Sequence, residues 1–131
     1  MKKSIILLII ILFISACSDN NELEGDIVFG KLKGNNEIQA INVFTIGEKM
    51  NFLIETNQKI GVEEVNVTLN ILNPKGDYEE VTSNSMPTNP EADQIMNGLP
   101  ASLFEQLGAG AYQLEVNIDG TVVKGEFIYE E

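Results

Sequence analysis

Hydrophobic and polar residues alternate along several stretches of this chain with a period of two, which is typical of half-buried β-strands. The clearest stretch is Val65–Ile71, where valine, leucine and isoleucine alternate with asparagine and threonine. The same pattern fills Ala111–Ile118 and Val122–Tyr129, and Asp119-Gly120 between them signals a two-residue type I′ turn. We therefore predict a β-hairpin here, with inward residues Tyr112, Leu114, Val116, Ile118, Val123, Phe127 and Tyr129.

Shorter alternating stretches predict four further strands, at Ile27–Leu32, Ile41–Phe44, Met50–Glu55 and Tyr78–Thr82. Turns separate some of them, at Gly47-Glu48-Lys49 and at Asn73-Pro74-Lys75-Gly76. Short strands that each have one polar face favour two packed sheets. The predicted fold class is all-β: an antiparallel β-sandwich of about seven strands, formed by a single domain over residues 26–131.

Residues 84–108 interrupt this rhythm and predict a short helical insertion. Asn89 is a good N-cap, Pro90 suits a first helical position, and Gly98 is expected to end that helix. Pro100 is expected to open a second helix that ends at Gly108 and gathers on one side Leu103, Phe104 and Leu107. The insertion is either a crossover that plugs one end of the sandwich or a binding loop. The helical spacing of its apolar residues favours the plug.

The carboxyl-terminal hairpin resembles the last two strands of immunoglobulin-like extracellular domains. The resemblance rests on Gly110–Val116, Asp119-Gly120 and Gly125-Glu126-Phe127. Within it, Gly110-Ala111-Tyr112 is similar to the tyrosine corner of those domains, which implies a hydrogen bond from the Tyr112 phenol to upstream backbone. Leu114 stands where antibody domains have their second cysteine, and the chain has no tryptophan. The resemblance therefore implies the broader immunoglobulin-like class, not an antibody-type domain.

The amino-terminal end has the layout of an export signal. Two lysines precede the continuous apolar run Ile5–Ile14, which is too short to cross about 30 Å of hydrocarbon as a permanent anchor. The run ends in Ile14-Ser15-Ala16-Cys17, and this resembles the lipobox of bacterial lipoproteins. The resemblance implies that residues 1–16 are removed and that Cys17 becomes the lipidated first residue, on the extracytoplasmic face of the cell membrane. Residues 17–25 would then form a short acidic tether.

Removal of residues 1–16 leaves six of the eight basic residues, all lysine, and all 20 acidic ones, which gives a net charge of −14. A chain this acidic has no basic footprint for nucleic acid, so we expect no nucleic-acid partner. The simplest role of the charge is solubility, although attraction to a basic partner would speed association. The stretch 18–25 spans at most about 28 Å when extended, so a partner is expected close to the membrane.

Catalytic and metal-binding constellations are absent from the sequence. Without histidine, the chain has neither a Ser-His-Asp triad nor imidazole ligands, and Cys17 is its single cysteine. Paired carboxylates occur, most densely in the acidic turn 75–80, but none has the spacing of a calcium-binding EF-hand loop. We therefore expect no enzymatic activity, no metal and no cofactor.

Two function classes remain open from the sequence. One is a membrane-anchored binding module that engages a protein, peptide or glycan near the membrane. The other is an accessory, regulatory or inhibitory subunit of a cell-envelope complex. Candidates for the contact surface are apolar residues in otherwise polar segments, because exposed apolar patches mark interaction sites. These residues are Tyr78, Met86, Ile95 and Met96.

Overall fold

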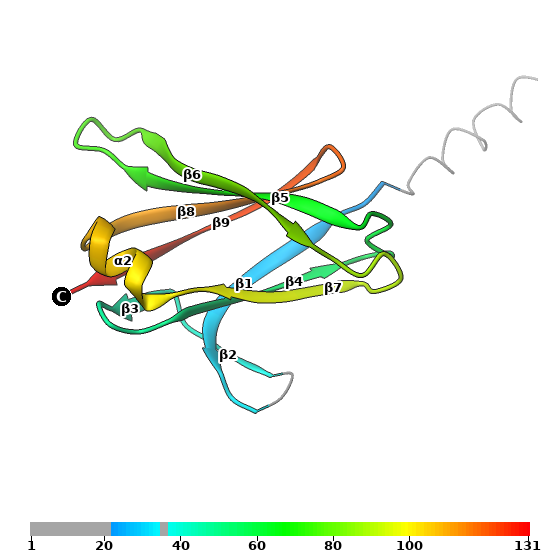
Figure 1. Cartoon of the computed structure of the whole chain (residues 1–131), viewed down its shortest axis with the longest axis horizontal. Helices are drawn as coiled ribbons and strands as arrows, with labels where there is room; N and C mark the ends of the chain where they lie inside the picture. The colour runs from blue at the N-terminus through cyan, green and yellow to red at the C-terminus, as the bar shows by residue number, and fades with distance from the viewer. Residues whose placement is uncertain (1–21, 35–36) are drawn as a thin grey trace, which may run out of the picture.

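The computed structural model describes residues 22–34 and 37–131, which form two β-sheets packed face to face (Figure 1). The first sheet has the strand order β2-β1-β4-β7, formed by Ile38–Ala40, Gly25–Leu32, Met50–Thr56 and Gln94–Leu99. The second has the order β3-β9-β8-β5-β6, formed by Val43–Thr45, Thr121–Glu130, Gly110–Ile118, Glu64–Leu72 and Tyr78–Pro87. The predicted all-β sandwich is confirmed. Cys17 and the predicted signal peptide lie outside the described residues.

The carboxyl-terminal hairpin supplies two adjacent strands of the second sheet. β8 and β9 pair antiparallel, from Gly110 opposite Tyr129 to Ile118 opposite Thr121. Asp119 and Gly120 both have positive φ, 51° and 97°, as a type I′ turn requires. Each residue predicted to face inward is buried. The alternation of the sequence therefore determines which face of this hairpin meets the core.

The described chain has nine strands, more than the seven or so predicted. Residues 38–40 form the short strand β2, and the predicted strand Ile41–Phe44 begins only at Val43. β6 also continues past its predicted end at Thr82, as far as Pro87. Two strands are additional: β7, which lies in the 84–108 segment, and β2, which arises because the chain changes sheets between β2 and β3.

This crossing makes one strand pair parallel, where the sequence predicted a purely antiparallel sandwich. Ile41 N–H donates to Phe29 O in the first sheet at 2.9 Å, whereas Asn42 O accepts from Ile128 N–H in the second at 2.8 Å. β3 then runs along β9 in the same direction, with Val43 opposite Ile128. β3 pairs only with the last residues of β9.

The predicted helix over residues 89–98 is wrong, because Gln94–Leu99 is the strand β7, paired antiparallel with β4. The side chain of Asn89 does accept a hydrogen bond from Glu91 N–H, at 3.0 Å, but it stabilises the turn between β6 and β7. Such capping bonds are local, and a turn satisfies them as well as a helix does. Pairing with β4 then decides the conformation of the residues that follow.

The second predicted helix is present as α2, Ala101–Leu107, which lies at one end of the sandwich (Figure 1). Its Phe104 is fully buried and stacks on Tyr129, with ring centroids 4.0 Å apart. The rings of Phe104 and Tyr112 meet edge to face, with centroids 5.1 Å apart. The helical part of the 84–108 segment is therefore a structural plug.

Tyr112 makes the hydrogen bond that the tyrosine-corner resemblance implied. Its phenol donates to Gly108 O, upstream in the chain, at 2.5 Å. Gly108 follows α2 directly, and its N–H donates to Phe104 O at 2.8 Å. Burial raises the pKa of the Tyr112 phenol, which therefore stays protonated as a donor. The bond ties the end of α2 to β8.

Residues 22–24, which lead into β1, are held at the other end of the sandwich by hydrogen bonds to the side chain of Asn57. Its amide nitrogen donates to Glu22 O at 3.0 Å, and its side-chain oxygen accepts from Glu24 N–H at 2.8 Å. Leu23, between them in the sequence, packs against the core. The last residues of the predicted tether 17–25 are thus docked on the domain.

Candidate binding surface

The outer face of the five-stranded sheet carries a row of apolar residues. Val43 lies opposite Ile128, and Ile128 lies opposite Ala111. The register of β5 with β8 places Leu72 beside Ala111, and Leu72 pairs with Tyr78. These five residues, one from each strand, are called the apolar band below.

The band is exposed on a sheet face that is otherwise largely polar. Val43 and Ile128 each keep 44% of their surface exposed, and Leu72 keeps 39%. Single exposed apolar residues are common on proteins, whereas a contiguous row of them is a candidate interaction surface. A hollow of about 180 Å³ lies on the band, lined by Asn42, Tyr78, Ala111, Glu126, Phe127 and Ile128.

A polar row with an acidic residue at each end runs beside the band. The row consists of the next outward residue on each of four strands: Glu126 on β9, Gln113 on β8, Asn70 on β5 and Glu80 on β6. The Asn70 amide, in the middle of the row, donates to Gln113 Oε1 at 3.0 Å and to Glu115 Oε1 at 2.6 Å. The Asn70 amide at the centre of the row therefore has its hydrogen-bond partners within the sheet. Glu126 and Glu80, at the two ends, make this side of the band negative.

Tyr78 connects the band to the polar row. The pKa of its phenol is raised, first by burial and then by the negative charge of Glu126. The phenol is therefore protonated at neutral pH and can donate a hydrogen bond to a bound partner. A ring that combines an apolar body with a polar tip is the type of side chain enriched at protein interfaces.

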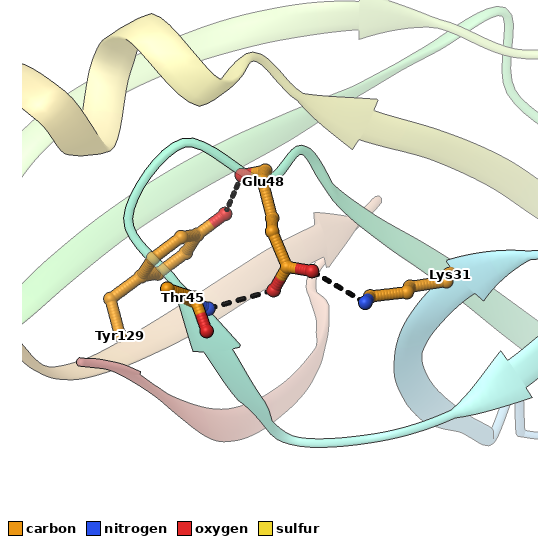
Figure 2. A network of polar contacts seen from close by, with 4 residues as sticks. All are labelled: Lys31, Thr45, Glu48 and Tyr129. Carbon is orange, nitrogen blue, oxygen red and sulfur yellow. Dashed lines mark hydrogen bonds and ion pairs between the residues drawn. The ribbon is translucent and has the colours of Figure 1, made fainter. Parts of the chain in front are cut away.

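β3 brings Val43 into the band, and a polar network around Glu48 holds β3 in place (Figure 2). The Glu48 carboxylate accepts from Thr45 N–H at 2.8 Å and pairs with the Lys31 ammonium at 2.5 Å. The carbonyl of Glu48 accepts the phenol hydrogen of Tyr129 at 2.6 Å. One turn residue therefore links β1, β3 and β9.

Glu48→Gln is expected to lower the free energy of unfolding by about 1 kcal/mol at neutral pH, because it removes a charge-assisted bond. The pKa of Glu48 is held below its ordinary value of 4.5, first by the bond from Lys31 and then by that from Thr45 N–H. A lowered folded-state pKa stabilises the fold above about pH 4.5, and this contribution disappears as the pH falls through the folded-state pKa. Urea unfolding at about pH 7 and about pH 3 should show a smaller difference between wild type and variant at the lower pH.

Glu91→Gln is the matched control for this prediction. Glu91 pairs with Lys59 at 2.8 Å, but the two side chains are 75% and 67% exposed. Its loss is therefore expected to change stability by less than about 0.5 kcal/mol. Equal losses from the two variants, or a Glu48 effect that does not change with pH, would contradict the role given to Glu48.

A second hollow opens between β6 and β7, at one open side of the sandwich. It is a cleft of about 180 Å³ lined by the core residues Phe52, Leu69 and Leu114. Met86 also lines the cleft, and its sulfur accepts a hydrogen bond from Asn97 Nδ2 at 2.8 Å. The cleft is small and mostly apolar, so it suits a single apolar side chain of a partner.

The structure separates the four residues that the sequence suggested for a contact surface. Tyr78 lies in the apolar band, Met86 lies in the β6–β7 cleft, and Met96 lines a hollow beside the turn that joins these strands. Ile95 is only 6% exposed and belongs to the core, so its predicted place on a contact surface is wrong. The four therefore do not form one site.

Most of the band was not predicted from the sequence: Val43, Leu72, Ala111 and Ile128. Each is an apolar residue that stands directly beside an inward one and so breaks the alternation, as Ile128 does between Phe127 and Tyr129. These interruptions were the available signal. The row itself depends on the register of five strands, which the sequence does not display.

Across residues 22–34 and 37–131, no group of three or more cysteine, aspartate or glutamate side chains could hold a metal ion. The acidic turn 75–80 is organised by Asn73, whose side-chain oxygen accepts from Lys75 N–H and Asp77 N–H at 2.9 and 3.0 Å. In the same described part of the chain, no helix has the length and apolar character needed to span a membrane.

Comparison with known proteins shows the fold. No protein-family model and no curated protein matches the sequence. Among solved structures, the chain is similar to an immunoglobulin-like protein from Pseudomonas aeruginosa, with a TM-score of 0.58 and 12% sequence identity. The match covers 86% of this chain and 99% of that one. The predicted immunoglobulin-like sandwich is confirmed.

Proposed function

We propose that this chain is a non-catalytic binding module, held at the extracytoplasmic face of the cell membrane by lipidated Cys17. Its contact surface is the apolar band, and its partner is a membrane-proximal protein. The observation that carries the proposal is a row of apolar residues that crosses all five strands of one sheet, with Val43, Leu72 and Ile128 exposed and Ala111 and Tyr78 half-buried.

The position of the band suits a partner that approaches the side of an anchored domain. The band crosses β9 at Ile128, whereas the docked amino-terminal segment enters β1 at Gly25, which lies against Val123 of β9. The strand between Val123 and Ile128 is roughly 17 Å long. The five residue steps from Cys17 to Glu22, where the docked segment begins, span at most about 18 Å. A domain anchored in this way holds the band within a few tens of ångströms of the lipid.

The chemistry of the band favours a partner surface that is apolar at its centre and basic at its edge. Complete burial of a valine, leucine or isoleucine side chain stabilises a contact by roughly 1.5–3 kcal/mol. Glu126 and Glu80, at the two ends of the polar row, would attract lysine or arginine and speed encounter with such a partner. The same acidic groups would disfavour like-charged proteins.

An accessory, regulatory or inhibitory role in a cell-envelope complex is the second candidate. The docking of Glu22 and Glu24 on Asn57 favours it, because a short, fixed approach holds the domain in a narrow zone beside the membrane. Recovery of the protein in a single stoichiometric membrane complex would support this role. Recovery with soluble or wall-derived ligands would support the general binding module.

Ile128→Glu is expected to weaken partner binding at least tenfold, because it places a charge within the apolar band, between Val43 and Ala111. The matched control is Val122→Glu. Val122 is a β-branched residue on the same strand and the same face, and it is 48% exposed against 44% for Ile128. Both variants should keep the fold, and the measurement is recovery of cross-linked partner from solubilised membranes.

The comparison between the two variants decides the proposal. Loss of partner with Ile128→Glu and retention with Val122→Glu would place the contact on the band. Equal recovery with both variants and wild type would contradict it. Equal loss with both would show that the added charge, and not the band, governs binding.

A further inference from the structure

The sandwich is open along the side where β1 and β9 lie beside each other. β3 pairs with β9 only from Ile128 to Glu130, so no strand of the described chain lies along that edge over Thr121–Phe127. β2 pairs with β1 only from Gly30 onward, which leaves Gly25–Val28 without a strand on the same side. Two strand edges therefore border one open groove.

Backbone hydrogen-bonding groups of β9 point into this groove. Ile128 N–H points toward the β3 side, where it donates to Asn42 O at 2.8 Å. Successive residues of a strand point their N–H and C=O groups to opposite sides, and β9 pairs with β8 without a bulge. The N–H and C=O groups of Glu126 and Lys124 therefore also point toward the β3 side, but beyond the reach of β3.

The opposite wall presents the same chemistry. Phe29 O points toward the β2 side, where it accepts from Ile41 N–H at 2.9 Å. By the same alternation, the backbone groups of Ile27 point into the groove. Ile27 also packs over Gly125 of β9, where an added Cβ would come within 2.7 Å of its Cγ2 atom. The base of the groove is therefore apolar while its edges are polar backbone.

The groove has the dimensions for a short strand. Its volume is about 460 Å³, and its lining comes from β1, β9 and the crossing between β2 and β3. Ile27 and Ile41, both half-buried, provide its apolar lining. Lys124 and Glu126 stand at its outer rim with opposite charges.

We propose that this groove binds an extended segment of another polypeptide, which adds to the second sheet as a strand along β9. A row of N–H and C=O groups at strand spacing is matched by another extended backbone. β3 already occupies the same edge in this way, so an added strand would continue its line along β9. The proposal uses backbone groups of β9 and does not depend on the apolar band.

The two faces of the sheet determine which types of side chain the bound segment carries. Inward residues meet Ile27 and Ile41 and are apolar, whereas outward residues stand beside Lys124 and Glu126 and carry charges of both signs. A second copy of this chain is disfavoured as the occupant, because each copy carries a net charge of −12 before any processing.

Amide hydrogen exchange of the full protein in detergent tests the site, with the synthetic peptide acetyl-Lys-Val-Glu-Val-Lys-Val-Glu-amide as the probe. At about 90% saturation, exchange of the Lys124 and Glu126 amides is expected to slow about tenfold. The amides of Val123 and Gly125 point toward β8 and serve as internal controls that should not change. The same peptide with every backbone nitrogen methylated cannot donate to β9 and should give no protection. Unchanged exchange at Lys124 and Glu126, or protection confined to the outer edge of β6, overturns the proposal.

Two substitutions of Lys124 distinguish the contribution of its backbone N–H to peptide binding from that of its side chain. Lys124→Pro removes the side chain and the edge N–H, whereas Lys124→Ala removes the side chain alone. Proline is tolerated on an edge strand where its missing N–H faces solvent, so Lys124→Pro should fold. Peptide affinity is expected to fall at least tenfold with proline and less than threefold with alanine. Equal affinities of the two variants overturn the proposal. If the proline variant does not fold, the exchange measurement on the wild-type protein is the deciding test.

Discussion

Phe104→Ala is expected to lower the free energy of unfolding by about 3–5 kcal/mol, the largest stability effect expected from the substitutions considered for this domain. Phe104 is fully buried, stacks on Tyr129 at 4.0 Å and meets Tyr112 and Phe127 edge to face at 5.1 and 5.8 Å. Its ring joins α2 to both strands of the carboxyl-terminal hairpin. Removal of the ring leaves a cavity between elements that cannot close around it without moving α2.

Urea unfolding measures this loss, and Gln106→Ala is the control. Gln106 lies on the same helix but is exposed, so its replacement is expected to change stability by less than about 0.5 kcal/mol. A domain of this size has about 5–15 kcal/mol of total stability, so Phe104→Ala removes a large share of it. A loss below about 1 kcal/mol for Phe104→Ala would contradict the plug and would favour the alternative, in which α2 belongs to a separate binding loop.

Local pattern was sufficient to predict the carboxyl-terminal hairpin. The alternation in β8 and β9 decides which side chains face the core, and Asp119-Gly120 decides the turn, because few residues adopt positive φ twice in succession. The Tyr112 bond to Gly108 O is also local, since the two residues lie close together in the sequence. Each of these features is determined within a few residues.

β7 was mispredicted because its local signals conflict with its tertiary pairing. Asn89, Pro90 and Glu91 suit the start of a helix, yet they also suit the turn that the chain forms there. Ile95 lies opposite Ile54 of β4, a fully buried residue, and this long-range pairing places Ile95 in the core. Pairing between strands overrides weak helical propensity when it buries apolar side chains.

The apolar band could not be predicted for a related reason. Tyr78 was identified from its own segment, but Val43 joins the band only because β3 crosses to the second sheet and pairs parallel with β9. That crossing depends on the bond between Asn42 and Ile128 and on the network around Glu48, which involve residues far apart in the sequence. A surface assembled from five strands becomes visible only when their registers are known.

The Cys17→Ala variant is expected to lose all metabolic labelling with palmitate, which would be the largest functional effect of any single substitution. The proposal attaches the protein to the membrane through a thioether from this thiol to diacylglycerol, whose two acyl chains meet the requirement for stable anchoring. Ser18→Ala, at the adjacent residue, is the control and should be labelled as wild type.

Labelling is a sharper measurement than membrane fractionation for this variant. Without lipidation, cleavage before residue 17 is also expected to fail, and the retained apolar run Ile5–Ile14 could itself hold the precursor in the membrane. The variant should therefore be larger than the mature protein on a gel, by the mass of residues 1–16, and should carry no label. Palmitate labelling that persists in Cys17→Ala would contradict the lipid anchor. It would leave the apolar band as an interaction surface without the membrane restriction on its partner, because the band depends only on the folded domain.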